Sequence, residues 1–465
     1  MMDNISIAII GILILSNIIF FNIIRNKYRN PKRPVLACFL DIIISVLQFL
    51  RIGVWGKENT ILSSLQSAVQ FHKYKLTDLG GIDNGAKMLQ RYDITRKLGL
   101  ERSEAKYTPL GYHITLVSLT ERMKTRLGLI QYFKEHKNIE KIDVGKPVFI
   151  IGFPRTGTTF LHELLGLHPD VRMHYTWEQM DPVPRTNDES KVAQLKDRKI
   201  RYNSNKGRMN TFLGLVGDEI QSIHRLGYDD SEECTIPCAM ELPWNILELP
   251  LMVYAAKEII EMGAGETYDF YKKYLQLLAW QTNNTKSDLT WMLKCPFHLP
   301  YLKELADAFP GSTVVWTHRN PTECIASACS LYESILGMVM ERNSINKIAL
   351  GKAVMNYSEL AMKKAMEAIP LIKSKINIEH VRYIDIVKSS KEVCKKIAEA
   401  TNLGFSVAYD NNITLYLQKN ASEREKLKAK NKNEKELHTY SLEEYGLSKE
   451  IVEEKFAFYI KQFNL

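Results

Sequence analysis

The chain has 465 residues, of which 45% are hydrophobic and 25% are charged, with 24 glycines and 16 prolines. This is an ordinary globular composition, and it excludes a collagen-like chain, a disordered tail and a small disulfide-stapled protein. The formal charge of +9 suits anionic partners, but the 62 Lys and Arg residues are scattered and form no pattern that predicts nucleic-acid binding.

The seven cysteines show no metal-ligand spacing. The only close pair, Cys234 and Cys238, has no second Cys or His pair nearby. The sequence therefore predicts buried thiols and no metal site.

The first element in chain order is an uncharged apolar stretch at residues 5–24. As a helix, its twenty residues would extend ~30 Å, the hydrocarbon thickness of a bilayer. The stretch follows Met-Met-Asp rather than a basic start, and five basic residues follow it within residues 25–33. These features favour a retained transmembrane helix over a cleaved signal peptide.

A second apolar stretch runs from Val35 to Leu50 and contains Asp41 and Gln48. An Asp at the centre of a span costs ~2.5–3.5 kcal/mol, so an interfacial or re-entrant helix is expected, with a core helix as the alternative. With one span, the basic flank predicts that the main domain faces the cytosol, whereas two spans would place it in a lumen.

The rest of the chain divides in two. Residues 51–146 form a mixed helical region, with helices expected at 84–91 and 112–137. From Pro147 onward, short apolar runs at 148–153, 289–293, 313–317 and 381–386 alternate with helical stretches. This pattern predicts an α/β domain over 147–465, a P-loop-like parallel sheet flanked by helices with a helical insert at 185–285. The Lys-rich segment 419–435 is expected to be a solvated linker, with a lid that faces the phosphates as the alternative, and 442–463 an amphipathic helix.

The sharpest local motif, GFPRTGTTFL, begins at Gly152 and follows the first predicted strand. A buried strand, a turn and a helix start in this order aim backbone N–H groups and the positive end of a helix at one point, which is an anion site. The glycine spacing matches the NTPase phosphate loop, but Thr158 replaces its Lys and the cation is Arg155. The loop therefore predicts phosphate binding and argues against ATP or GTP hydrolysis.

A second motif surrounds Arg319, which follows the strand predicted at 313–317. Asn320, Pro321 and Glu323 are typical of a helix start with a capping box, and Ser327 lies about two turns into that helix. An Arg at the carboxyl end of a strand occupies the place where doubly wound sheets bind ligands. Its planar guanidinium suits a phosphate.

Together the two motifs resemble the paired signatures of sulfotransferases that use 3′-phosphoadenosine 5′-phosphosulfate (PAPS), especially the membrane-associated branch with a P-R-[ST]-G-T-T loop. The resemblance covers 147–465 and makes this the sulfotransferase domain. It implies that Arg155, Thr156, Gly157, Thr158 and Thr159 hold the 5′-phosphosulfate. It also implies that Arg319 and Ser327 hold the 3′-phosphate, and that residues 185–285 lie on the acceptor side.

The resemblance also supplies candidate catalytic residues. Lys294 stands where soluble members carry an active-site Lys, and with Arg155 it would stabilise the transferring sulfonate. Soluble members place a His where this chain has Pro296, so the base is not carried over directly. Relatives with this loop use a Glu shortly after it, which makes Glu178 the first candidate, followed by His298 and then by Glu233 or His224.

The sequence thus predicts a membrane-anchored sulfotransferase that moves a sulfonate from PAPS to a hydroxyl of a glycan, lipid or sterol-like acceptor. The resemblance implies that the domain lies in the Golgi or ER lumen, whereas the flanking charge favours the cytosol. The alternatives are a catalytically inactive membrane protein that keeps the nucleotide site and an atypical P-loop kinase. The acceptor, the organelle and the oligomeric state are not predicted.

Overall fold

The computed structural model describes residues 35–49, 82–216, 227–282, 289–430 and 441–465. The transmembrane helix predicted at 5–24, its basic flank and the candidate base His224 lie outside these residues. None of the helices in the described part combines the length and the apolar composition needed to cross a membrane.

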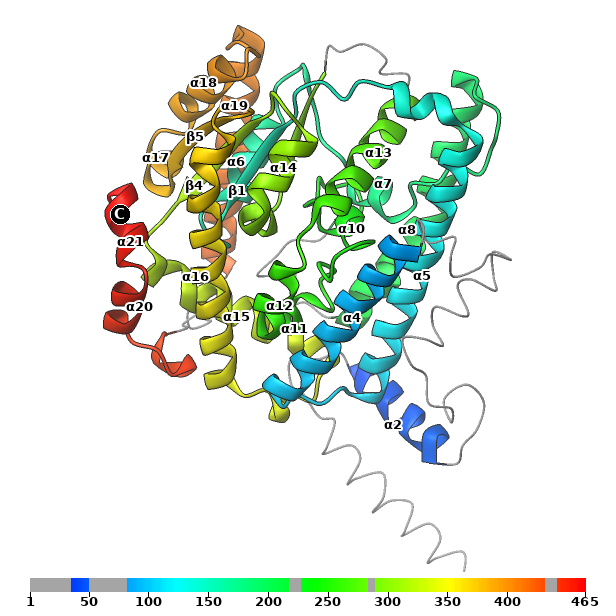
Figure 1. The fold of residues 1–465 in the computed structure, drawn as a ribbon, viewed down its shortest axis with the longest axis vertical. Helices are drawn as coiled ribbons and strands as arrows, with labels where there is room; N and C mark the ends of the chain where they lie inside the picture. Colours follow the sequence, from blue (N-terminus) through cyan, green and yellow to red (C-terminus); the bar gives the residue numbers. More distant parts are fainter. Residues whose placement is uncertain (1–34, 50–81, 217–226, 283–288, 431–440) are drawn as a thin grey trace, which may run out of the picture.

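Five parallel strands form the centre of the described part of the chain. They are β1 (Val148–Gly152), β2 (Val171–Arg172), β3 (Thr290–Lys294), β4 (Thr313–His318) and β5 (Asn377–Arg382), in the spatial order β2-β3-β1-β4-β5. Every residue of β1 and β4 is buried, because helices cover both faces of these central strands (Figure 1). The parallel α/β fold expected from the short apolar runs is therefore confirmed.

One strand lies elsewhere than the sequence predicts. The pattern predicts a strand at 381–386, whereas β5 ends at Arg382 and Tyr383–Lys388 form helix α17. Val381 and Ile386 are buried in the same apolar cluster, one from the strand and one from the helix. Their spacing therefore did not distinguish the two kinds of element. The sequence also gives no sign of β2, which has two partly exposed residues.

Two apolar layers flank the sheet. On one face, Ile150 and Val315 pack with residues of α6 (Thr158–Leu165), α18 (Ser390–Ala400) and the start of α19 (Val407–Lys430). On the other face, Phe149, Ile151 and Trp316 pack with residues of the larger helices. Those helices are α13 (Gly265–Gln281), α14 (Leu302–Ala308), α15 (Pro321–Val339) and α16 (Lys347–Ile372).

The chain between β2 and β3 is mostly helical where it is described, as expected for the insert. Its elements are α7 (Thr176–Met180), α8 (Lys191–Val216), α10 (Thr235–Cys238), α11 (Leu249–Met252), η4 (Val253–Ala255), α12 (Ala256–Glu261) and α13. Short 3-10 helices, η5 (Pro296–Tyr301) and η6 (Arg342–Ser344), follow β3 and α15.

The first of the two helices expected within 51–146 is longer than the predicted 84–91, whereas the second lies close to the predicted 112–137. The N-terminal elements are α2 (Val35–Phe49), α4 (Ile82–Ser103), α5 (Pro109–Glu135) and the 3-10 helix η3 (Lys137–Lys141). Thr108 caps α5 by accepting a hydrogen bond from the Gly111 N–H, and a proline occupies the first turn. Buried ion pairs from Arg122 to Glu248 and from Arg126 to Glu241 join α5 to the insert.

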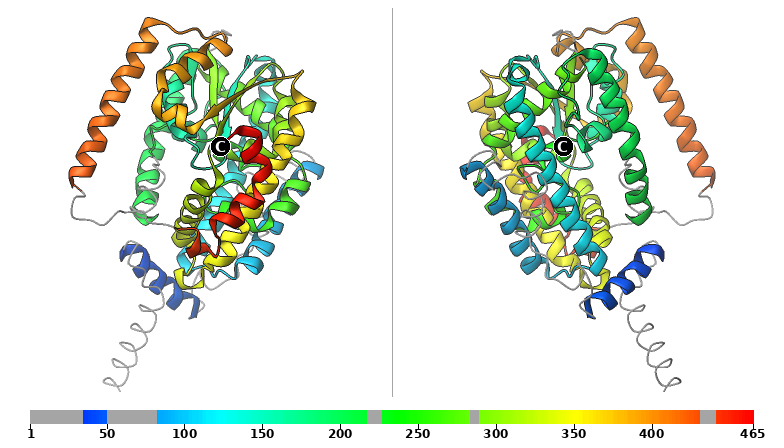
Figure 2. Two further views of the ribbon diagram at one scale, coloured as in Figure 1. Left: turned by 90° about the vertical axis from the view of Figure 1, so that its left-hand side faces the viewer. Right: turned by 90° about the vertical axis from the view of Figure 1, so that its right-hand side faces the viewer.

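Two C-terminal expectations are wrong. Residues 419–430 continue helix α19, which stands along one side of the molecule (Figure 2), so this part of the segment is a helix and not a linker. Its run of Lys, Glu, Arg and Ala consists of strong helix formers, which do not need an apolar stripe to favour a helix. The tail is not one helix but η7 (Glu443–Tyr445), α20 (Lys449–Lys455) and α21 (Ala457–Phe463). Gly446, with a φ of +66°, ends the first of these turns.

Candidate active site

The phosphate loop, Lys294 and Arg319 gather at the carboxyl edge of the sheet, whereas the candidate bases Glu178 and His298 lie elsewhere. The phosphate loop follows β1, Lys294 ends β3, Arg319 follows β4 and Tyr383 follows β5. Gly152 of β1 is paired with Thr317 of β4, so the loop and Arg319 leave the sheet side by side. Carboxyl edges of parallel sheets are the usual ligand sites of this architecture.

The phosphate loop has an unusual backbone. Arg155 and Gly157 have φ values of +73° and +87°, and Arg155 is one of the few non-glycine residues of the described chain in this region. The Thr156 hydroxyl lies 2.7 Å from the Phe153 carbonyl oxygen and 2.6 Å from the Thr317 hydroxyl, which fixes the centre of the turn. A left-handed Arg costs free energy and is typical of functional loops.

Helix α6 begins directly after this turn. Gly157 is its N-cap and supplies no side-chain cap, so the first backbone N–H groups of the helix keep their hydrogen-bonding capacity. The side chains of Arg155 and Thr159 are exposed on either side of Gly157. The turn therefore offers an accessible anion site with a guanidinium and a hydroxyl beside the helix N-terminus.

Arg155, Ser327 and Arg319 form one cluster. Arg155 Nε donates to Ser327 Oγ across 3.1 Å, and Arg319 Nη1 donates to the Arg155 carbonyl oxygen across 3.0 Å. Asn320 caps α15 as predicted, accepting from the Thr322 N–H. The predicted capping box is not formed by Glu323, whose carboxylate accepts from Arg319 Nε at 2.8 Å.

Tyr383 completes this cluster and was not among the sequence candidates. The Arg319 guanidinium lies 4.1 Å from the centre of the Tyr383 ring. A Cβ atom at Gly157 would lie 3.0 Å from Cδ2 of the same ring. The carboxyl-edge rule that selects Arg319 would have selected Tyr383 as well, had β5 been placed correctly.

Lys294 lies between the loop and the insert. Its Nζ is 2.7 Å from Glu233 Oε1 and 3.4 Å from Thr159 Oγ1. Burial lowers the pKa of Lys294, but the nearby Glu233 and Glu232 carboxylates outweigh this and leave that pKa raised, so the ammonium stays charged. Lys294 and Glu233 are thus brought to the loop, Glu233 having been a minor candidate in the sequence.

Glu178 is buried in α7, the first helix after β2. Its Oε1 accepts from Arg198 at 2.6 Å and from Arg172 at 3.3 Å, and its Oε2 accepts from the Tyr175 N–H at 3.1 Å. The two guanidiniums also lie over the rings of Trp177 and Trp291. Both oxygens of Glu178 therefore have structural partners within the protein.

His298 lies in the apolar layer rather than at the loop. Its ring is fully buried beside Phe149 and Trp244, and its Nδ1 is 2.8 Å from the Tyr268 hydroxyl. Burial lowers the pKa of His298 to about 3, so the imidazole is neutral at physiological pH. The hydrogen-bond partner of His298 Nδ1 is thus Tyr268 and not a group of the phosphate loop.

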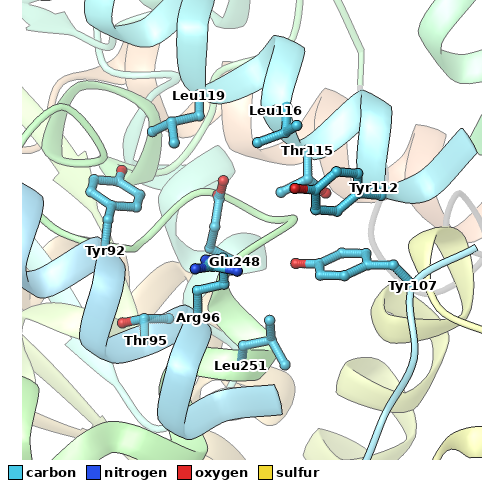
Figure 3. A pocket seen from close by; sticks show the side chains of 10 residues that line it. All are labelled: Tyr92, Thr95, Arg96, Tyr107, Tyr112, Thr115, Leu116, Leu119, Glu248 and Leu251. Carbon is cyan, nitrogen blue, oxygen red and sulfur yellow. The ribbon is translucent and has the colours of Figure 1, made fainter. Parts of the chain in front are cut away.

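Two cavities differ in place and size. An open pocket of about 430 Å³ lies at the carboxyl ends of β4 and β5, between His318, His380 and the C-terminal Phe463. A cavity of about 30 Å³ lies between α4, α5 and α11, where the Tyr107 and Tyr112 hydroxyls turn toward Glu248 (Figure 3). The second has room for about one water molecule, so it is not a substrate site.

Comparisons with known proteins agree with this geometry. A sequence model of the sulfotransferase family matches residues 147–406, more than half of the chain. Sulfotransferase STF1 from Mycobacterium tuberculosis H37Rv has a similar fold, with a TM-score of 0.65 and 23% identity over 86% of this chain and 99% of that one. Sulfotransferase STF9 from Mycobacterium avium gives a TM-score of 0.64 and 21% identity over 88% and 98%. No curated protein has a significant sequence match to the chain.

Proposed function

The chain belongs to the sulfotransferase family and is an enzyme of that class, and we propose that it transfers a sulfonate from PAPS to a hydroxyl of a glycan, lipid or sterol-like acceptor. The observation that carries the proposal is the cluster of Arg155, Ser327 and Arg319 beside the N-terminus of α6. Two adjoining sites for anions suit a donor with phosphate groups on two sides of its ribose.

Each part of the cluster has a proposed role. Arg155, the backbone N–H groups from Thr156 through Gly157 and Thr158 to Thr159, and the exposed Thr159 hydroxyl would hold the 5′-phosphosulfate, while the Thr156 hydroxyl stays within the turn. Arg319 and Ser327 would hold the 3′-phosphate, since a planar guanidinium and a hydroxyl together match its oxygens. Tyr383 would keep the Arg319 guanidinium in place by stacking under it, at 4.1 Å.

Transfer needs positioned positive charge and a proton acceptor. The acceptor oxygen forms a bond to sulfur while the bond from sulfur to the 5′-phosphate oxygen breaks, and the hydroxyl proton leaves to a base. Lys294 and Arg155 would balance the negative charge that develops on the leaving oxygen. The products are a sulfate ester and 3′,5′-adenosine bisphosphate.

We assign the base to Glu233 in place of Glu178. Glu233 lies 2.7 Å from Lys294 Nζ, which itself reaches Thr159 of the loop at 3.4 Å. Glu178 has both carboxylate oxygens occupied by Arg172, Arg198 and the Tyr175 N–H. Within the described ranges the Glu233 carboxylate is paired only with Lys294, so it is better placed to accept a proton near the loop.

The membrane anchor is a separate proposal, which rests on the sequence of residues 5–24. It would bring the enzyme close to a glycan, lipid or sterol-like acceptor at a membrane. The two arguments for orientation disagree. The flanking basic residues place the main domain in the cytosol, whereas the resemblance to the membrane-associated branch places it in the Golgi or ER lumen.

The donor is tested by nucleotide binding to the full chain. We expect 3′,5′-adenosine bisphosphate to bind more tightly than 5′-AMP, ADP or ATP. Arg319→Ala should weaken bisphosphate binding by about 10- to 150-fold, as loss of a charge-assisted contact of ~1.5–3 kcal/mol predicts. Equal affinity for all four nucleotides, or a preference for ATP, would contradict PAPS as donor and favour an atypical kinase.

Arg102→Ala is the matched control. Like Arg319, Arg102 bonds one carboxylate, that of Glu258, and one carbonyl, that of Tyr254. It lies on α4 and belongs to no part of the cluster. Its replacement should leave bisphosphate affinity unchanged, which separates a local effect from a general loss of stability.

The base is tested by Glu233→Gln in a sulfonate-transfer assay. We expect kcat to fall by about 10²–10⁴-fold while bisphosphate affinity is kept. Full turnover by this variant would exclude Glu233 as the base. If the unaltered enzyme binds the bisphosphate but sulfonates none of the hydroxyl acceptors, the catalytically inactive alternative is favoured.

A further inference from the structure

Helix α2 exposes a continuous apolar stripe. Leu36, Phe39 and Ile43 are 57%, 56% and 37% exposed, and their spacing of three and four residues places them on one face. Asp41 is the only charged residue in the helix. The face turned to solvent therefore carries large apolar side chains, which water solvates poorly.

The opposite face of α2 is fixed to the body of the protein. Ala37 and Ile44 pack in a buried cluster with Leu110 of α5. Asp41 is fully buried, and its Oδ1 accepts a hydrogen bond of 2.7 Å from the Leu110 N–H in the first turn of α5. The carboxylate sits at the positive end of that helix, which stabilises it there. The rotation of α2 is thereby set, and the apolar stripe points outward.

The position and length of α2 define the kind of partner that fits the stripe. The helix lies at one end of the molecule beside α5 (Figures 1 and 2). Its 15 residues extend ~22 Å, which is too short to span a bilayer but suits a helix that lies along its surface.

The sequence before α2 favours an anionic lipid bilayer as the partner of the stripe. Five basic residues occupy 25–33, immediately before Val35, and the uncharged stretch at 5–24 precedes them. Basic residues next to an apolar helix face are attracted to anionic headgroups while the apolar face enters the acyl boundary. A protein partner would need neither of these features.

We propose that α2 is a membrane-surface element, with Leu36, Phe39 and Ile43 inserted at the headgroup–acyl boundary of an anionic bilayer. Asp41 does not enter the lipid, because its carboxylate is bound to α5. The bond to Leu110 then fixes how the body of the enzyme is oriented above the membrane. This inference does not depend on the sulfotransferase reaction.

The test must report on α2 itself, because residues 5–24 would hold the chain on a membrane without it. The full chain carries Ile43→Cys with an environment-sensitive nitrobenzoxadiazole label and is bound to phosphatidylcholine–phosphatidylserine vesicles. Cys38→Ala removes the partly exposed native thiol, and the other six cysteines are buried. Brominated phosphatidylcholine then quenches labels that reach the acyl region.

The matched control is Ile348→Cys in the same background. Ile348 lies on α16 and is 65% exposed, so it carries a label equally well but belongs to another surface. We expect the label at position 43 to lose most of its fluorescence to the brominated lipid and the label at 348 to lose none. Vesicles of phosphatidylcholine alone should give weaker quenching at 43.

Two results would overturn the proposal. If vesicle-bound protein shows no quenching at 43, the stripe lies away from the lipid. If the label at 43 is already shielded from aqueous iodide without vesicles, the stripe is covered by protein. Light scattering then distinguishes the covers: a doubled mass indicates a second copy, and an unchanged mass indicates another part of the same chain. Resistance of the bound protein to carbonate extraction reports separately on the anchor at 5–24.

Discussion

Arg155 Nε donates a hydrogen bond of 3.1 Å to Ser327 Oγ, a residue 172 positions later in the chain. The bond joins the loop after β1 to the helix after β4, and so links the proposed sites for the two phosphate groups of the donor. The sequence does not predict this contact, because the two residues belong to separate motifs. Their contact is what makes the carboxyl edge of the sheet a candidate for a bisphosphate nucleotide.

Ser327→Ala tests this link directly. Removing one hydroxyl should weaken 3′,5′-adenosine bisphosphate binding by about 5-fold, as expected for one hydrogen bond of ~1 kcal/mol. The affinity for 5′-AMP, which lacks the 3′-phosphate, should fall less, because it feels only the lost hydrogen bond to Arg155. Isothermal titration with both nucleotides measures the difference, and an equal loss for both would place Ser327 outside the 3′-phosphate site.

Glu178→Gln separates a structural from a catalytic role for Glu178. The variant leaves Arg172 and Arg198 without their buried anion, and breaking such a pair costs about 3–5 kcal/mol of the free energy of unfolding. We expect a lower urea midpoint but a near-normal kcat per folded molecule. The control Glu140→Gln removes an exposed ion pair with Lys273 and should cost at most ~1 kcal/mol. A normal urea midpoint with lost turnover would return Glu178 to the role of base.

Gly157→Ala tests the loop conformation. An Ala at a φ of +87° costs roughly 1–2 kcal/mol, and its Cβ would also press on the Tyr383 ring at 3.0 Å. Gly145→Ala is the control, because Gly145 has a φ of +67° with nothing within 4 Å of the added atom. Both variants should lose stability, but only Gly157→Ala should also lose bisphosphate affinity. Unchanged affinity would show that the loop tolerates a displaced Tyr383.

Stability should fall in acid because of buried histidines. Burial lowers the pKa values of His162, His174, His298 and His318 to about 3, well below the ordinary 6.5. Between pH 6.5 and 3 the unfolded chain binds these protons and the folded protein does not. Each His then removes about 1.4 kcal/mol of the free energy of unfolding per pH unit as the pH falls, and the stabilisation is fully present above pH 6.5.

His298→Asn measures one such contribution. Asn keeps a polar partner for the Tyr268 hydroxyl but does not titrate. The dependence of the free energy of unfolding on pH, from urea titrations between pH 4 and 5.5, should become shallower by about 1.4 kcal/mol per pH unit, because His298 is protonated there in the unfolded chain only. An unchanged slope would mean that His298 is protonated in the folded protein. Retained turnover would also exclude His298 as the base.

Much of the fold could be predicted because its signals are local. The strands at β1, β3 and β4 are short apolar runs buried on both faces, and the loop from Gly152 to Thr159 combines glycines with an Arg and three Thr residues. The helical insert and the Asn320 cap are local signals too. Where local signals were ambiguous, as at 381–386, the strand was misplaced and Tyr383 was overlooked.

The proposed choice between Glu178 and Glu233 as the base depends on contacts that only the tertiary structure shows. Glu178 and Glu233 are both acidic residues near motif segments, and their sequence neighbours do not distinguish them. The fold places Glu178 between two guanidiniums and Glu233 beside Lys294. These contacts join residues up to 61 positions apart, so no spacing rule in the sequence describes them.

By itself the sequence determined the features that point to the family: a phosphate loop without the kinase Lys and an Arg after a later strand. Turns, helix starts and apolar periodicity depend on residues that are close in the sequence, so the sequence alone can predict them. Only the tertiary structure decided which side chains meet: Arg155 with Ser327, Lys294 with Glu233, and Asp41 with the start of α5. Such contacts depend on the order in which strands pair and helices pack, which brings together residues that are distant in the sequence.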